Sequence, residues 1–90
     1  MLKIELVPDL SHCIETVAKR EYREATAKLL AAGEGNEELQ ERVELLRLFL
    51  ETTDFKKLRR ESEKYLVEGR TAKFVIHWEN GVPKYEIRVS

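Results

Sequence analysis

The dipeptide Asn80-Gly81, flanked on both sides by alternating apolar and polar residues, constrains the fold more than any other feature of this chain. Asn-Gly is typical of a type I′ turn, which needs two positive φ angles and joins two antiparallel strands through a two-residue loop. It therefore predicts strands over residues 71–79 and 82–89. A two-residue loop sets the register of the strands, so Glu79 should lie opposite Val82. Each residue before Glu79 should then lie opposite the corresponding residue after Val82.

This register separates an apolar face of the predicted hairpin from a polar face. The apolar face pairs Trp78 with Pro83, Ile76 with Tyr85, Phe74 with Ile87, and Ala72 with Val89. The other face pairs His77 with Lys84, Val75 with Glu86, and Lys73 with Arg88. The turn and the alternation independently indicate the same register. We therefore expect a hairpin with one buried face and one face in water.

Upstream of the hairpin, the pattern predicts one strand and a first helix. Residues 2–7 alternate as a strand with one buried side does, and Pro8 ends that strand because it cannot donate a ladder hydrogen bond. Asp9 and Ser11 are both suitable N-caps, so a helix should begin at one of them and end at Gly33. Its apolar stripe, with steps of three and four residues, consists of Leu10, Cys13, Ile14, Val17, Ala18, Ala25, Leu29 and Ala32.

A helical pattern also runs through residues 37–68, after the N-cap residue Asn36. A single helix of that length would measure about 48 Å at 1.5 Å per residue. The predicted strands reach only about 25 Å, so half of such a helix would find no sheet to cover. Thr52-Thr53-Asp54 contains two β-branched residues and another N-cap, which places a break there. The third helix should then end at Gly69.

The resulting order, β-α-α-α-β-β, predicts one α+β domain over residues 1–90, with a three-stranded sheet and helices packed on one face. If the three helices alternate in direction along the strands, the first strand runs parallel to residues 71–79 and antiparallel to residues 82–89. Antiparallel pairs are commoner, so we prefer the strand order 2-3-1. This order would leave residues 71–79 at an edge of the sheet.

Composition restricts the cellular compartment and the classes of partner that we expect for this chain. The chain has sixteen Lys and Arg residues and seventeen Asp and Glu residues, which gives a net charge of −1. This balance argues against a protein that binds polycations or polyanions through its overall charge. The single cysteine forms no internal disulfide, and no apolar run is long enough for a signal peptide or a membrane span. We therefore expect a cytoplasmic protein with no membrane contact. We also expect no cofactor and no metal, because neither His12 nor His77 has neighbours at ligand spacing.

Few residues suggest catalysis, and we assign no catalytic residue. Ser11-His12-Cys13 is a candidate nucleophile cluster, but Cys13 falls on the apolar stripe, where a cysteine usually acts as a small hydrophobe. A hydrolase that works through His77 and Glu79 stays open only because two-layer folds carry unrelated chemistries. No nucleotide-binding, zinc-protease or serine-hydrolase motif occurs, so a non-enzyme is favoured.

Basic residues gather in two places and indicate an anion or nucleic-acid surface as one alternative. On the helix over residues 55–66 they are Lys56, Lys57, Arg59, Arg60 and Lys64; on the polar face of the sheet they are Lys73, His77, Lys84 and Arg88. Small sheets with cationic faces do bind nucleic acid. The aromatic residues that would stack on bases point inward here, however, and Glu5 and Glu86 dilute the positive charge.

Protein interaction is the other alternative, and the one we favour. If residues 71–79 form an edge strand, Lys73, Val75 and His77 mark a surface that can pair with another chain. Pairing of two identical edges would give a homodimer with a continuous sheet, and a monomer is equally compatible with the sequence. The sequence does not determine the function. It favours a small cytoplasmic interaction or regulatory domain over a nucleic-acid-associated protein.

Overall fold

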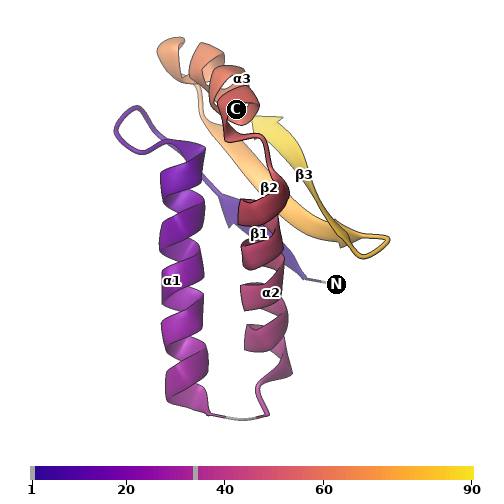
Figure 1. The fold of residues 1–90 in the computed structure, drawn as a ribbon. Helices are drawn as coiled ribbons and strands as arrows, with labels where there is room; N and C mark the ends of the chain where they lie inside the picture. The colour runs from indigo at the N-terminus through magenta and orange to yellow at the C-terminus, as the bar shows by residue number, and fades with distance from the viewer. Residues whose placement is uncertain (1, 34) are drawn as a thin grey trace.

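The computed structural model describes residues 2–33 and 35–90 of the chain, and it confirms the expected α+β order of elements. These elements are β1 (Lys3–Leu6), α1 (Ile14–Ala32), α2 (Glu37–Thr52), α3 (Phe55–Val67), β2 (Ala72–Glu79) and β3 (Val82–Val89). The first strand is followed by all three helices, and the hairpin closes the chain (Figure 1).

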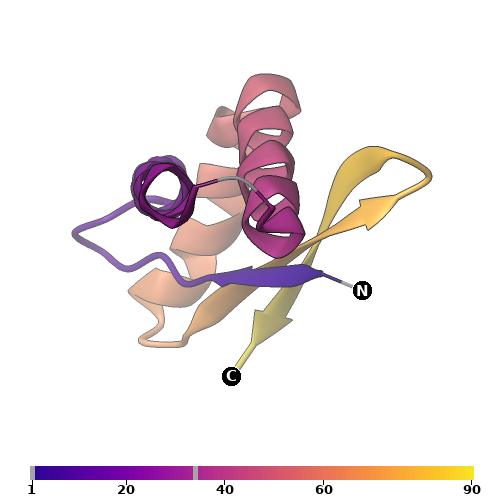
Figure 2. The ribbon, with the colours of Figure 1, turned by 90° about the horizontal axis from the view of Figure 1, so that it is seen from below.

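The molecule has two layers, a helical layer and a three-stranded antiparallel sheet. The helices α1 and α2 run antiparallel side by side, and the last turn of α1 and the first turn of α2 lie well beyond the sheet, as Figure 1 shows. In Figure 2, α1 is seen along its axis, whereas β1 runs across the view below α2. The helix pair therefore crosses the sheet steeply, and only part of its length covers the strands.

The core lies between the layers. Its largest buried side chains come from all three helices and from the first two strands: Ile4, Leu6, Ile14, Leu45, Leu46, Phe49, Leu58, Phe74 and Ile76. Tyr85 and Ile87 of β3 are half-buried against the same cluster. The distribution follows the alternation of each strand, because side chains at every second residue point to one face.

The hairpin confirms the predicted register pair by pair, from Glu79 opposite Val82 to Ala72 opposite Val89. Asn80 and Gly81 have φ angles of 53° and 76°, as a type I′ turn requires. The aromatic rings of Phe74 and Tyr85 lie 5.8 Å apart between their centroids on the buried face. Local turn chemistry thus determined this half of the sheet.

The expected strand order 2-3-1 is wrong. The order is β1-β2-β3, so residues 71–79 contain the central strand, and β1 pairs antiparallel with β2, with Ile4 opposite Ile76 and Leu6 opposite Phe74. The expectation assumed that each helix lies along the strands and reverses the chain direction. Because α1 and α2 instead cross the sheet steeply, the number of helices does not determine the direction of β2 (Figures 1 and 2).

Val75 shows the consequence most clearly. Its side chain is on the face away from the helices, where the sequence suggested exposure, yet only 1% of it is accessible. It lies between Glu5 on β1 and Glu86 on β3, so both sides of Val75 are flanked by neighbouring strands. Apolar residues on both faces are typical of a central strand, and β2 has them at Phe74, Val75 and Ile76.

The break between the second and third helices is confirmed. The Asn36 side chain accepts a hydrogen bond from the backbone N–H of Leu39, and that of Asp54 accepts one from Lys57, so both act as N-caps. Thr53 is extended between α2 and α3. The third helix ends at Val67, and Gly69 follows with a φ of 77°.

The expected start of the first helix is wrong, because α1 begins at Ile14 with Cys13 as its N-cap residue. The Asp9 carboxylate instead closes a tight turn, in which it accepts hydrogen bonds from the backbone N–H groups of Ser11 (2.8 Å) and His12 (2.7 Å). Leu10 lies in this turn and is 76% exposed, so it does not belong to the buried stripe.

Candidate functional site: the free edge of the sheet

The strand β3 forms one edge of the sheet, and its outward backbone groups can be assigned from the ladder. The N–H groups of Thr71 and Ser90 each donate to the other residue's carbonyl, at 3.1 and 3.0 Å. Backbone groups of a strand alternate in direction, so even-numbered residues of β3 bond to β2 and odd-numbered residues point away. The N–H groups of Tyr85, Ile87 and Val89 therefore face outward, and among residues 2–33 and 35–90 no strand lies beside them.

The same three residues also carry the apolar side chains of this edge. Tyr85, Ile87 and Val89 point toward the helical layer, and all three are partly exposed. The helices reach them only in part, because β3 lies at the side of the sheet away from α1 (Figure 2). Burial, and then the negative charges of Glu61 and Asp54, raise the pKa of Tyr85, which fixes this ring as a neutral phenol.

The charged side chains of β3 occupy the opposite face, where Lys84, Glu86 and Arg88 alternate in sign. Ladder neighbours extend this alternation into three rows across the sheet. Lys3, His77 and Lys84 form one row, Glu5, Val75 and Glu86 the next, and Lys73 and Arg88 the third. An acidic row thus separates two basic rows, and it pairs with the row of Lys73 and Arg88 through Lys73–Glu5 (3.4 Å) and Arg88–Glu86 (3.7 Å).

The residues expected to mark a free edge, Lys73, Val75 and His77, lie on the central strand instead. Both hydrogen-bonding edges of β2 are occupied, by β1 and by β3. His77 is partly buried, and its Nδ1 lies 3.4 Å from the carbonyl oxygen of Trp78. The signal that would have placed the edge correctly is Pro83, because a proline within a strand is typical of an edge.

The other edge, β1, is a poorer surface for pairing. It contains only Lys3–Leu6 and is followed by the buried Pro8, so it has half the length of β3. Its outward residues, Lys3 and Glu5, are charged and exposed. Charged residues at an edge are a common way in which natural sheets prevent pairing with another strand. The long free edge of the described sheet is therefore β3.

The basic residues of α3 are exposed on the outer side of the helical layer. Arg59 pairs with Glu63 at 3.1 Å, Lys64 lies over the ring of Tyr65, and Arg60 donates from Nε to the carbonyl oxygen of Lys56. Leu58 and Ser62 form the buried side of the helix. Lys56, Lys57, Arg60 and Lys64 therefore point away from the core.

The two groups of basic residues meet at one place, where Lys57 of α3 and Lys84 of β3 line the same pocket. The other basic residues are more separated: Lys73 and Arg88 lie on the polar face of the sheet, whereas Lys56 and Arg60 are exposed on α3. Figure 2 shows the two layers in profile.

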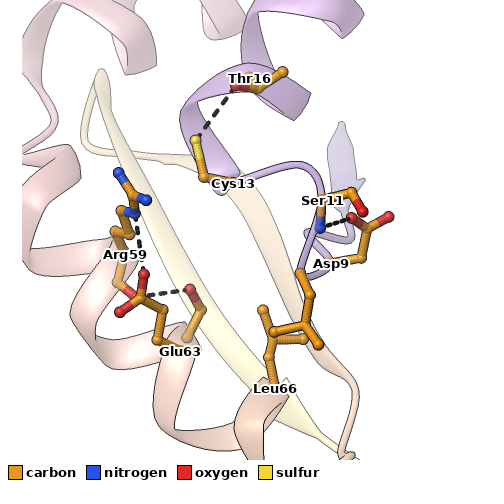
Figure 3. A pocket seen from close by; sticks show the side chains of 9 residues that line it. Asp9, Ser11, Cys13, Thr16, Arg59, Glu63 and Leu66 are labelled. Carbon is orange, nitrogen blue, oxygen red and sulfur yellow. Dashed lines mark hydrogen bonds and ion pairs between the residues drawn. The ribbon is translucent and has the colours of Figure 1, made fainter.

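A pocket between the turn before α1 and the exposed side of α3 brings together other candidate residues. Asp9, Ser11, Cys13 and Thr16 line one wall, and Arg59, Glu63 and Leu66 line the other (Figure 3). Its volume of about 180 Å³ is below the roughly 300 Å³ at which ligand sites begin. Cys13 is thus a pocket-lining residue, and the expectation that it packs in the apolar stripe of the helix is wrong.

The Cys13 thiol has an environment that favours its ionised form. Its Sγ lies 3.3 Å from the Thr16 hydroxyl, which donates to the thiolate, and this hydrogen bond lowers the pKa of Cys13. The backbone N–H of Thr16 and the charge of Arg59 lower this pKa further. The Nδ1 of His12 lies 3.2 Å from Oδ1 of Asp9. In residues 2–33 and 35–90, no three His, Cys, Asp or Glu side chains are placed to hold a metal ion.

Residues 2–84 match the model of a protein family, so the chain belongs to this family, whose model carries no functional description. No curated protein and no solved structure shows a significant similarity to the chain. None of the helices in the described ranges combines the length and the apolar character needed to cross a bilayer.

Proposed function

We propose that this protein is a small, non-enzymatic interaction domain that binds its partner along the free edge of β3. One observation carries the proposal: the outward N–H groups of Tyr85, Ile87 and Val89 coincide with partly exposed apolar side chains at the same residues. An added strand would gain main-chain hydrogen bonds and cover apolar surface at once, which is the usual basis of strand addition.

The chemistry of the edge supports binding of a polypeptide more than binding of a small molecule or a nucleic acid. Strand addition requires unpaired backbone donors and acceptors in regular spacing, and a peptide supplies the complementary set. The single thiol of Cys13 is compatible with a reducing cytoplasm, where we propose that the domain acts.

Nucleic-acid association is the alternative, and the exposed cations of α3 favour it. Lys56, Lys57 and Arg60 face outward together, although Arg59 beside them is paired with Glu63. We rank it second because Glu5 and Glu86 interrupt the basic residues of the sheet.

Site-specific photocrosslinking in living cells tests the proposal. A photoreactive residue replaces Lys84, which is exposed on β3, and the matched control carries it at Lys28, which is exposed on α1. We expect defined protein adducts, identified by mass spectrometry, from position 84 and not from position 28.

A second variant ties the adducts to the edge itself. Val89→Pro removes an outward N–H group and leaves the hydrogen bonds between β2 and β3 in place, so it should abolish the adducts without unfolding the domain. Equal labelling from positions 84 and 28, or adducts that persist in a folded Val89→Pro protein, would contradict the proposal.

A further inference from the structure

We infer that the free edge of β3 takes the β3 strand of a second copy of this chain, antiparallel, around a twofold axis that passes through Ile87. The inference rests on the proposed function and names the partner within it. The product is a dimer with one continuous sheet, in which each subunit contributes its three strands.

Backbone chemistry restricts where the axis can lie. Only the odd-numbered residues of β3 point outward, so in an antiparallel pair each of them must face an odd-numbered residue of the second copy. Near the middle of the edge, this leaves three positions for the axis: Tyr85, Glu86 and Ile87.

An axis at Ile87 places that residue opposite its own copy and places Tyr85 opposite the partner's Val89. All three outward N–H groups then find acceptors, and Pro83, which has no N–H group, lies outside the paired stretch. An axis at Tyr85 would instead set Pro83 opposite the partner's Ile87, which loses a donor on each side of the dimer.

The charges on the polar face of the sheet favour an axis at Ile87 over one at Glu86. With the axis at Ile87, Glu86 faces the partner's Arg88, and symmetry repeats this attractive pair. With the axis at Glu86, that residue would face its own copy, and Lys84 would face the partner's Arg88, so that every charged pair is repulsive. The alternating signs of Lys84, Glu86 and Arg88 therefore exclude the middle register.

The apolar face agrees with this choice. Across the axis, the contacts are Ile87 with Ile87, and Tyr85 with Val89, all of which are partly exposed in the single chain. Cross-strand pairs of aromatic and β-branched residues stabilise sheets. Since a domain of this size buries a modest share of its surface, covering these side chains is an effective route to further stability.

Analytical ultracentrifugation of the full chain, over a range of concentrations, tests the inference. The wild type should sediment as a species of twice the chain mass of 10.6 kDa. Arg88→Glu and Glu86→Arg each turn two attractive pairs into repulsive ones, so each should weaken dimerisation about tenfold or more. The double variant Glu86→Arg/Arg88→Glu should restore it.

Lys84→Glu is the matched control, because Lys84 faces the uncharged Ser90 of the partner when the axis lies at Ile87. It should leave the dimer constant unchanged, and circular dichroism checks that each variant is folded. A loss in Lys84→Glu as large as in Arg88→Glu, or no rescue by the double variant, would overturn this register.

A wild type that stays monomeric at about millimolar concentration would overturn self-pairing altogether. That outcome is distinguishable from failure of the proposed function, because crosslinks from position 84 to a different protein would then still identify the edge as a binding surface. A monomer without any edge-specific crosslink would overturn both proposals.

Discussion

The Cys13 thiol illustrates how the first residues of a helix change the chemistry of a side chain. Because α1 begins at Ile14, Cys13 lies just before the helix. There it accepts hydrogen bonds from Thr16, three residues further along the chain. These donors favour the negatively charged thiolate. The thiol is therefore more acidic in the folded protein than in the unfolded chain.

We expect the alkylation of Cys13 by iodoacetamide to reach half its maximal rate at a lower pH in the folded protein than in the urea-unfolded one. Thr16→Val removes the hydroxyl that is the largest cause of the lowered pKa, so it should raise this midpoint, while Thr16→Ser should keep it. The test is the rate of Cys13 alkylation as a function of pH, measured by mass spectrometry for each variant. Identical profiles for Thr16→Val and the wild type would contradict the assignment.

The same pKa difference has a definite sign for stability. A group whose pKa is lower in the folded state stabilises that state when it is ionised. The contribution of Cys13 is therefore fully present above the pKa of the unfolded thiol, and it is lost as the pH falls through the folded pKa.

At the scale of the secondary-structure elements, short-range capping decides where helices begin. Asp54 caps α3, whose first turn contains Lys56 and Lys57 and no acidic residue. Two cations at this end of the helix interact unfavourably with the helix dipole, so the stability of the first turn of α3 depends strongly on the Asp54 cap. The carboxylate of Asp54 satisfies a backbone donor and also lies close to these charges.

We expect Asp54→Ala to lower the free energy of unfolding by about 1 kcal/mol, the usual cost of a lost N-cap. Asp54→Asn keeps the accepting oxygen and should lose less than Asp54→Ala. Urea unfolding at neutral pH, followed by circular dichroism, measures both. Equal losses in the two variants would show that charge, and not the cap hydrogen bond, is the main contribution of Asp54.

The turn of the hairpin provides a second prediction at this scale. Gly81 has a φ of 76°, and a β-carbon added there would meet no atom within 4 Å, so its substitution is opposed by backbone strain alone. Gly81→Ala should therefore cost roughly 1–2 kcal/mol. Thermal unfolding detects this change, and a Tm equal to that of the wild type would show that the turn has relaxed to another type.

At the scale of the whole molecule, the distribution of charge separates the two candidate functions. Among the sheet cations, Lys73 is paired with Glu5 and Arg88 with Glu86, whereas Lys84 lines a pocket together with Lys57 of α3. Binding of nucleic acid through neutralised phosphates would give a log affinity that falls linearly with log salt concentration.

We therefore expect no salt-dependent binding of a labelled single-stranded or duplex oligonucleotide in fluorescence anisotropy at low salt. The net charge of −1 and the carboxylates of Glu5 and Glu86 among the sheet cations both oppose it. Lys56→Glu/Arg60→Glu serves as the control, because it should change nothing if the wild type does not bind. Tight binding that this variant abolishes would favour the nucleic-acid alternative over the interaction domain.

Much of the fold was predictable because it depends on near neighbours in the chain. Asn80-Gly81 determined the turn, the alternation around it determined the hairpin register, and Asn36 and Asp54 marked two helix starts. The candidate site was less predictable. Its residues belong to the predicted hairpin, but the expected edge was on the wrong strand of that hairpin.

The sequence by itself determined the order of the elements, their boundaries within a few residues and the face that each strand buries, because turns, caps and alternation act over short distances. Only the tertiary structure decided that β1 joins β2, that Val75 is covered and that β3 is left free. These outcomes depend on how α1 and α2 cross the sheet, and that crossing is set by packing among residues far apart in the chain.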